Sequence, residues 1–531
     1  MIIYRPKRVL ILKVRNTDRI TNIIPTAKVI VHRGQPLVAV PHRLDEVRVL
    51  RNLGIPAPSP IRYYYRWAGQ NKPFHAQVET AEFLTMHDNA FVLNAMGTGK
   101  TLASLWVYDY LRSIGRVHKA LVLSPLSTLE RVWGDEIYMH FPHLKFAVVH
   151  GSAEKRLKLL NLDVDLYLIN HDGIKVRGFL EAMADRGDID LVIVDEIAEM
   201  ARTAGTDRWK ALNILCNKQG RRQVWGMTGT PTPNDPTDAW AQCRIVSPTR
   251  VSPYYTKFKE QVMRRVGNFT WLPREGSMEV VHQAMQPAVR YTREDCLDLP
   301  PCIYQTCETT LTPDQEKAYK AMLRHLCADV AEGRILAVNE AVKASKLVQI
   351  ACGVAYGVSG EEISIQASNR MALVKELIQA AGTKVIVFVP FTSAVRALTA
   401  YLERELNPMN FDTPEYVRMI YGEVSKAERD DIFHRFQKER LPHVLVAQPS
   451  AMAHGLNLTE ASTIIWYAPI TRNDHYEQAN GRITRSGQRN TQFIINIEGT
   501  PLERKMYARL KNKQDMQGIL LDLVEAASQT H

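Results

Sequence analysis

The residues best suited to chemistry are residues 97–101, GTGKT, which follow the apolar run 91–93. An apolar strand, a glycine-rich turn and a helix in this order aim successive backbone N–H groups and the positive end of the helix dipole at one small volume. That volume suits nucleotide phosphates, with Lys100 reaching the β and γ oxygens and the Thr101 hydroxyl holding Mg²⁺. The full phosphate-loop pattern has Gly where this chain has Asn94, so the match covers its second half.

Two carboxylates, Asp195 and Glu196, end a later apolar run at residues 191–194. Asp195 is placed to hold the water shell of Mg²⁺, and Glu196 to polarise an attacking water. Residues 224–234, VWGMTGTPTPN, indicate a further strand that ends in a hydroxyl-rich turn. Strands that alternate with helices and carry polar residues at their ends predict a parallel, doubly wound α/β sheet.

A second alternating series follows, with apolar runs at 384–391, 443–448, 463–469 and 493–497. The segment EQANGRITRSGQ lies between the last two runs. Arg482 and Arg485 are three apart, so they share one face if this segment is helical. Two guanidinium groups on one face fit γ-phosphate oxygens as arginine fingers. Taken alone, the segment is better explained as a solvated basic helix end.

Bulk properties describe a soluble globular protein of two or three domains, with 531 residues, 45% apolar and 23% charged. No apolar run approaches the roughly 18 residues that span a membrane. The N-terminal MIIYRPKRVLILKVRN is interrupted by charge too early for a signal peptide. Seven cysteines without a CxxC pair favour reduced thiols over a zinc site. We therefore expect a cytoplasmic protein without a membrane anchor.

The net charge of +11 is concentrated near the N-terminus, where residues 1–70 hold 13 Lys and Arg against three acidic residues. Such a concentration predicts binding to a polyanion, with a solvated surface without a ligand as the alternative. Short β-like runs and one helical segment predict a small α+β module there. Beyond the proline-rich stretch 55–60, residues 62–67 interleave arginine with aromatic rings, which either stack on bases or pack against the next domain.

The segments GTGKT, SPLSTLERVW, DE, TGTPTPN, AHGLNLTEAS and QANGRITRSGQ, in this order, resemble the motifs of superfamily 2 helicases. More narrowly they resemble the Swi/Snf-type DNA-dependent ATPases, in particular compact bacterial and phage members and, more loosely, the annealing, fork-remodelling helicases. The likeness runs from about Pro73 to Met506. It implies an α/β fold of two tandem RecA-like parallel-sheet lobes with a helical insertion region, beside the small basic α+β module.

The resemblance also implies a domain division. We expect a basic, DNA-binding N-terminal module at 1–66, an ATP-binding lobe at 67–250, a mostly helical connecting region at 251–370 and a C-terminal lobe at 371–531.

The resemblance assigns roles to single residues. Gln77 would contact adenine, Thr101 and Asp195 would serve Mg²⁺, and Thr228 and Thr230 would couple hydrolysis to lobe movement. The residues expected to bind the phosphates are Met96, Gly97, Thr98, Gly99, Lys100 and Thr101. The expected catalytic set is Lys100, Asp195, Glu196, Gln478, Arg482 and Arg485. The expected nucleic-acid contacts are Ser124, Pro125, His171, Thr228, Thr230, Phe391, Gly422 and Asn457. Three positions depart from the family pattern, namely Ala198, Gln448 and Thr484.

These features together predict an ATP- and Mg²⁺-dependent translocase on double-stranded DNA that remodels forks, branches or bound proteins. Contacts to phosphates rather than base edges predict little sequence preference. The alternatives are a strand-separating helicase on DNA or RNA, and a nucleic-acid-binding or polymerase-associated factor whose ATPase is vestigial.

Overall fold

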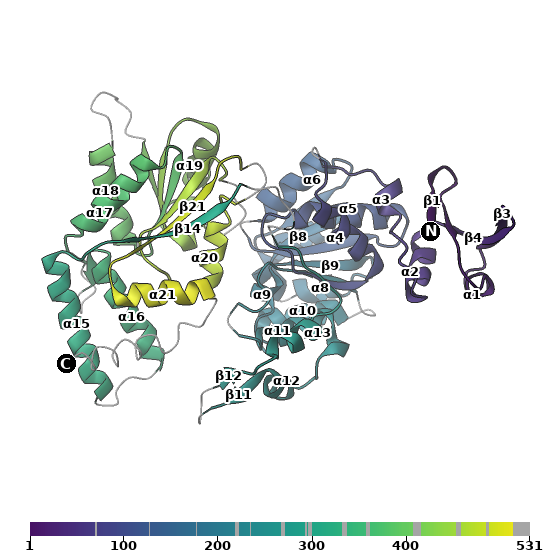
Figure 1. Cartoon of the computed structure of the whole chain (residues 1–531), viewed down its shortest axis with the longest axis horizontal. Coiled ribbons are helices and arrows are strands. Elements are labelled where there is room, and N and C mark those ends of the chain that lie inside the picture. Colours follow the sequence, from purple (N-terminus) through teal and green to yellow (C-terminus); the bar gives the residue numbers. More distant parts are fainter. Residues whose placement is uncertain are drawn as a thin grey trace. The chain divides into compact units, whose positions relative to one another are not determined.

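The chain divides into two compact units, Met1–Leu297 and Asp298–His531 (Figure 1). Each unit is described by itself. The structure, a computed structural model, describes residues 1–69, 72–126, 128–176, 178–217, 222–233, 235–266, 271–292, 295, 300–331, 337–356, 362–406, 416–452, 458–484 and 488–512.

The first unit begins with a small antiparallel sheet in the order β1-β2-β4-β3. Its buried side, with Leu10, Val38 and Val47 fully covered, forms a core of its own. This is the α+β module expected from the sequence. Its elements are β1 (Ile2–Tyr4), η1 (Arg5–Lys7), β2 (Val9–Leu12), α1 (Asp18–Thr21), β3 (Lys28–His32), β4 (Gln35–Pro41) and α2 (Leu44–Asn52).

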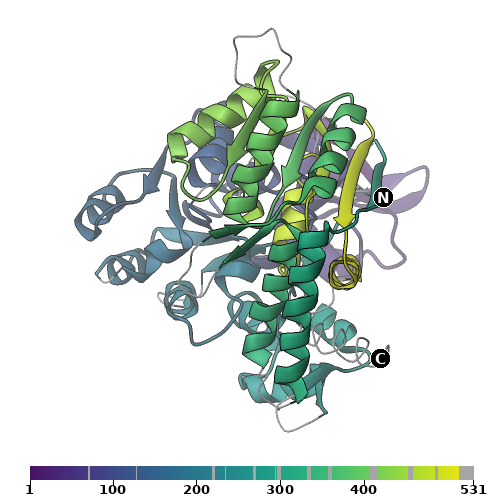
Figure 2. The same ribbon diagram turned by 90° about the vertical axis from the view of Figure 1, so that its left-hand side faces the viewer.

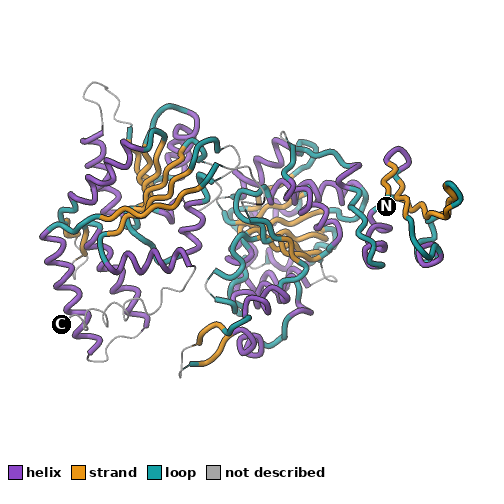
Figure 3. Tube along the Cα trace, viewed as in Figure 1, coloured by secondary structure: helices purple, strands orange, loops and turns teal. Residues whose placement is uncertain are grey.

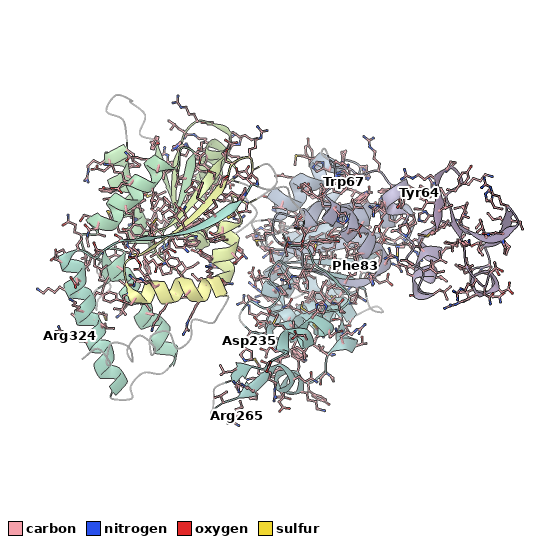
Figure 4. All side chains as sticks on the ribbon, viewed as in Figure 1. Tyr64, Trp67, Phe83, Asp235, Arg265 and Arg324 are labelled. Atoms are coloured by element: carbon pink, nitrogen blue, oxygen red, sulfur yellow. The ribbon has the colours of Figure 1, made fainter. Side chains whose placement is uncertain are left out.

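The aromatic segment that begins with α3 (Ile61–Tyr64) joins this module to the next sheet (Figure 4). The Tyr64 hydroxyl lies 3.0 Å from His42 Nδ1 in the module. The Tyr65 hydroxyl donates to Asp109 Oδ2 over 2.7 Å, and the Trp67 ring meets Trp106 edge-on with centroids 5.0 Å apart. These contacts favour the packing interpretation of the aromatic residues over base stacking.

The core of the first unit is a seven-stranded sheet in the order β13-β5-β10-β9-β6-β8-β7, and all its pairings are parallel. Parallel strands place their carboxyl ends at one edge, where ligands of doubly wound sheets bind. The strands are β5 (Asn89–Val92), β6 (Lys119–Ser124), β7 (Phe146–Val149), β8 (Leu166–Asn170), β9 (Ile189–Asp195), β10 (Gln223–Met227) and β13 (Ala288–Val289).

Helices cover both faces of this sheet (Figure 3). Alternate strand residues point to opposite faces, so Val122 and Ile193 pack with one set of helices, and Leu123 and Val194 with the other. The first face carries α4 (His75–Met86), α5 (Lys100–Ser113), η2 (Leu129–Gly134) and α6 (Asp135–His140). The second face carries α7 (Ala153–Leu160), η3 (His171–Lys175), α8 (Phe179–Ala184), α9 (Ile197–Met200), α10 (Asp207–Asn217), α11 (Asp238–Val246), α12 (Tyr255–Val262) and α13 (Ser277–Ala284). The turn η4 (Pro248–Arg250) and the ribbon of β11 (Met263–Arg265) and β12 (Trp271–Pro273) complete the unit.

The second unit contains a six-stranded parallel sheet in the order β14-β21-β20-β17-β19-β18. The helices α15 and α16 pack side by side and extend away from it (Figure 2). The strands are β14 (Cys302–Glu308), β17 (Lys384–Phe388), β18 (Val417–Ile420), β19 (Val444–Ala447), β20 (Ala461–Trp466) and β21 (Gln492–Glu498), beside the small ribbon of β15 (Val354–Tyr356) and β16 (Glu362–Ser364). The helices are α15 (Pro313–Ala331), α16 (Ala337–Ala351), α17 (Ser368–Ala380), α18 (Thr392–Leu406), α19 (Lys426–Lys438), η5 (Pro449–Met452), α20 (Asn473–Asn480) and α21 (Pro501–Asn512).

The expected pair of parallel-sheet α/β lobes is therefore confirmed. The stretch expected to be mostly helical also supplies an edge strand to each sheet, β13 to the first and β14 to the second. The sequence hid β14 because the strand is largely exposed and CIYQTCE lacks an apolar run. The predicted domain boundaries stay predictions.

Candidate nucleotide site

The predicted phosphate loop lies between β5 and α5, at the carboxyl edge of the first sheet. Gly97 and Gly99 adopt left-handed φ angles of 80° and 75°, which residues with a side chain rarely adopt. Gly99 caps α5, and Lys100 and Thr101 form its first turn. The strand, turn and helix expected from GTGKT are present, and the backbone N–H groups at the start of α5 have no partners within the helix.

Hydrogen bonds from side chains to backbone oxygens stabilise the bend of this loop. Lys100 Nζ donates to the backbone oxygens of Asn94 over 2.8 Å and Ala95 over 3.1 Å. The hydroxyl of the buried Thr98 donates to Ala95 O over 2.8 Å. The ammonium group therefore lies inside the loop, where a phosphate would meet it, and Met96 stands partly exposed at the bend.

Gln77, the residue expected to contact adenine, lies against the same loop. Its Oε1 accepts the Phe74 N–H over 2.9 Å, and its Nε2 lies 3.4 Å from Gly99 O. A Cβ on Gly99 would stand 2.2 Å from Gln77 Nε2. Gly99 is thus required both by its backbone angle and by the approach of this side chain.

The two predicted carboxylates end β9, which is separated from β5 by β10 alone. Asp195 Oδ1 accepts the Glu196 N–H over 3.1 Å, and Oδ2 accepts the Ser124 hydroxyl over 3.2 Å. Glu196 has a φ of 52°, an uncommon left-handed conformation for a residue with a side chain. Such strain occurs preferentially at functional sites, which fits the expected role of Glu196.

The hydroxyl-rich turn after β10 lies beside the phosphate loop. The Thr228 N–H donates to Val92 O over 3.1 Å, and the Thr228 hydroxyl accepts the Thr230 N–H over 3.2 Å. A Cβ on Gly229 would stand 3.5 Å from Met96 N. The sheet therefore brings the turn next to the loop.

Several residues expected to contact nucleic acid point inwards. Ser124, Pro125, His171 and Thr228 are buried, whereas the neighbouring Leu126 is 54% exposed. His171 Nε2 donates to Asp195 O over 2.9 Å, and burial lowers the pKa of its imidazole, so the ring is neutral. Ser124 and His171 thus both hydrogen-bond to Asp195, through its carboxylate and its backbone oxygen.

In the second unit, Gln478 lies partly buried on α20. On a helix Arg482 and Arg485 would share one face, but α20 ends at Asn480, and the buried Arg482 occupies a following turn. The Gly481 N–H makes the last helical hydrogen bond, to Glu477 O, and the Thr484 hydroxyl donates to Asn480 O over 3.3 Å. Arg485 and Asn457 lie outside the described residues.

Gln448, where the family has a smaller hydroxyl residue, connects three strand ends. Its Oε1 accepts the Gly422 N–H over 3.3 Å, and its Nε2 donates to the Thr392 hydroxyl over 2.9 Å. The expected contact residues Phe391 and Gly422, which follow β17 and β18, are thereby held at the same edge. Sequence reasoning noted Gln448 only as a departure and missed this role.

Trp133 is the residue near Asp195 that sequence reasoning missed. It is fully buried, and its Nε1–H donates to Asp195 Oδ2 over 3.1 Å. It stood inside the motif SPLSTLERVW, but no local signal connects it to a carboxylate more than sixty residues away along the chain.

The donor set fits ATP and Mg²⁺. The loop offers left-handed glycines, N–H groups and an ammonium group for phosphates. The hydroxyl of Thr101 and the carboxylate of Asp195 are hard oxygen ligands, which Mg²⁺ prefers. Among the residues that the structure describes, no helix is both long and apolar enough to cross a membrane.

The chain is similar to several known proteins. The model of the SNF2-related domain matches residues 76–352, more than half of the chain, and that of the helicase conserved C-terminal domain matches residues 369–487. The protein p41 of Acyrthosiphon pisum secondary endosymbiont phage 1 is 24% identical over 81% of this chain and 94% of its own length. The mouse DNA annealing helicase and endonuclease ZRANB3 is 25% identical over 81% of this chain, which spans only 39% of that relative. The SWI2/SNF2 ATPase core of Sulfolobus solfataricus, solved with dsDNA, is 23% identical, with 84% of this chain and 92% of that chain covered and a TM-score of 0.41.

Proposed function

Because the chain belongs to the SNF2-related family of DNA-dependent ATPases, we propose that it moves along duplex DNA by ATP hydrolysis and remodels forks, branches or DNA-bound proteins. The observation that carries the proposal is that one helix and three strand ends of the first unit supply the predicted site residues. These are the Gln77 helix, the phosphate loop, the Asp195–Glu196 strand end and the Thr228 turn.

We assign one role to each residue of the site. The loop N–H groups and Lys100 bind the β- and γ-phosphates, while Thr101 and Asp195 hold Mg²⁺ and its waters. Glu196 orients the attacking water, and the side-chain amide of Gln77 reads the adenine edge. When bound, Mg²⁺ supplies neutralisation of the phosphate charge.

The second unit completes the reaction in this proposal. Gln478, Arg482 and Arg485 approach the γ-phosphate when nucleotide draws the two units together. Arginine fingers contribute roughly 10³- to 10⁵-fold in rate. Closure would therefore switch hydrolysis on, and cycles of closure and release would move the grip on DNA along a strand.

The N-terminal module is the proposed substrate-binding part. Three basic residues in or beside it, Arg48, Arg51 and Arg62, pair with acidic residues of α4 or with Asp88 just after that helix. The nine remaining exposed cations before α2 suit a phosphate backbone. They are Arg5, Lys7, Arg8, Lys13, Arg15, Arg19, Lys28, Arg33 and Arg43.

The test compares ATP turnover with single-stranded DNA, blunt duplex, forked DNA and RNA side by side, and follows strand separation in parallel. We expect duplex and forked DNA to stimulate turnover while the blunt duplex stays paired. Release of single strands from a blunt duplex, or equal stimulation by RNA, would favour a strand-separating helicase instead.

Site variants make the same test sharper. Lys100→Ala and Glu196→Gln should remove most turnover and leave DNA binding largely intact, whereas Lys158→Ala, which alters an exposed surface ion pair on α7, should change neither. Ordinary turnover in Glu196→Gln would overturn the site assignment.

A further inference from the structure

The two carboxylate oxygens of Asp195 accept different hydrogen bonds. Oδ2 accepts two side-chain hydrogen bonds, from Trp133 Nε1 over 3.1 Å and from the Ser124 hydroxyl over 3.2 Å. Among the residues that the structure describes, the one donor to Oδ1 is the N–H of the next residue, Glu196, over 3.1 Å. A carboxylate oxygen has about two acceptor sites, so Oδ2 is saturated and Oδ1 keeps a free one. The two donors therefore fix which oxygen can face a metal-bound water.

Both donors belong to one local segment. Ser124 ends β6, and its hydroxyl lies 2.5 Å from the hydroxyl of Thr128, which also donates to Pro125 O over 2.8 Å. Trp133 follows on the π-helix η2. Its backbone N–H donates to Thr128 O, five residues earlier, over 3.1 Å. A π-turn is rare and often lies at a functional site. Here it turns the indole of Trp133 towards the end of β9.

The same segment carries an exposed surface at its other end. Leu126 is 54% exposed at the turn between the buried Ser124 and Thr128. The family resemblance puts Ser124 and Pro125 of this turn among the expected nucleic-acid contacts. If DNA contacts the turn, a hydrogen-bonded path only a few residues long would join that contact to the metal carboxylate.

We propose that Trp133 is a positioning residue that couples DNA contact at the turn after β6 to the orientation of Asp195 towards Mg²⁺. The inference rests on the proposed function and deepens it. A displacement of the turn by DNA moves η2 and with it the indole N–H. Asp195 then presents Oδ1 in the orientation that holds the water shell of Mg²⁺. The stimulation of turnover by DNA and the affinity for Mg²⁺ should therefore both depend on the hydrogen bond from Trp133 to Asp195.

A buried tryptophan usually finds some acceptor for its N–H, so packing alone is the competing explanation. Trp225 provides the comparison within this chain. It is fully buried in the same core cluster as Trp133, yet its Nε1 has no hydrogen-bond partner among the described residues. Burial of an indole in this core therefore does not require a bond to Asp195.

The experiment compares Trp133→Phe with Trp225→Phe in the full chain. Each variant removes an indole N–H from the same core. Three quantities are measured: the Mg²⁺ concentration for half-maximal turnover, the affinity for a fluorescent ADP with Mg²⁺ and with EDTA, and the stimulation of turnover by duplex DNA. Ser124→Ala removes the other donor with minimal change in volume.

We expect Trp133→Phe to raise the Mg²⁺ requirement about 10-fold, the lower end for groups that orient metal ligands. DNA stimulation should fall with it, while nucleotide affinity in EDTA stays unchanged. Ser124→Ala should shift both quantities in the same direction, and Trp225→Phe should shift neither. Wild-type Mg²⁺ dependence in Trp133→Phe, or equal shifts in Trp225→Phe, would overturn the inference. Failure of the proposed function itself would show separately, as ordinary turnover in Glu196→Gln.

Discussion

The side-chain amide of Asn94 donates a hydrogen bond to the Thr80 hydroxyl over 2.8 Å, which ties the start of the phosphate loop to α4. Asn94 is 2% exposed, and its Oδ1 accepts the Tyr291 N–H over 3.0 Å. The full phosphate-loop pattern has Gly here. This chain instead holds the loop between the Gln77 helix and the segment after the edge strand β13 by one buried and one part-buried hydrogen bond.

Restoring the pattern with Asn94→Gly should therefore harm the protein. The change removes the side-chain acceptor of the half-buried Tyr291 N–H, which should cost about 0.5–1.5 kcal/mol. Urea unfolding should show this loss of stability, and ATP affinity should fall because the loop loses its anchor. Thr80→Val, which removes one of the two bonds, should give a smaller loss. Tighter ATP binding by a fully stable Asn94→Gly would contradict this account.

Gly99 and Gln77 should behave as a coupled pair. Gly99→Ala places a Cβ at a φ of 75° and 2.2 Å from Gln77 Nε2, so nucleotide affinity should fall at least 10-fold. Gln77→Ala should mainly reduce the preference for ATP over GTP.

In the double variant the steric part of the loss disappears and the backbone strain remains, so the two effects should not add. Calorimetric titration with both nucleotides measures this cycle. Strict additivity would mean that the two side chains do not meet in solution.

Charge removal on the N-terminal module should change the salt dependence of DNA binding. Lys13, Arg15 and Arg33 are exposed, whereas Arg48 pairs with Asp88. Their replacement by Ala should lower the slope of log affinity against log salt by up to about 0.9 for each DNA phosphate that the protein no longer neutralises. Arg48→Ala, which breaks bonds to Thr85 O and Asp88, should alter stability but leave the slope unchanged.

These substitutions are a cleaner test than deletion of residues 1–66. Leu44 and Ile61 are buried in the core beside the seven-stranded sheet, so deletion of residues 1–66 would expose that core. A triple variant with the wild-type slope would indicate that the module faces a partner other than DNA.

The second unit depends on a buried ion pair between α17 and α21. Arg370 and Glu503 are 2% and 0% exposed, and Glu503 Oε2 also accepts the Gly499 N–H over 2.9 Å. Glu503→Gln leaves the Arg370 charge uncompensated and should cost about 3–5 kcal/mol, visible as a lower denaturation midpoint. The pair Arg370→Met with Glu503→Leu should recover much of that loss. Equal stability of the single variant and the wild type would argue against the pair.

Local patterns in the sequence were sufficient to predict the elements that form the nucleotide site of the first unit. Residues 97–101 require left-handed glycines before a helix, and four apolar residues before Asp195 and Glu196 require a buried strand that ends in carboxylates. The periodicity of apolar residues did not predict the strand β14 or the end of the helix α20. β14 is exposed and lacks an apolar run, and no periodic pattern indicates that α20 ends at Asn480, before Arg482.

What the sequence alone determined was the order and chemistry of the strand ends, because strand and turn propensities act over a few residues. What only the tertiary structure decided was which distant side chains meet. The strand order places β10 between β5 and β9, and thereby brings the Thr228 turn to the phosphate loop. Trp133 reaches Asp195 and Asn94 reaches Thr80 for the same reason: hydrogen bonds between segments follow from packing, and packing is settled only when the whole sheet and its helices close around a common core.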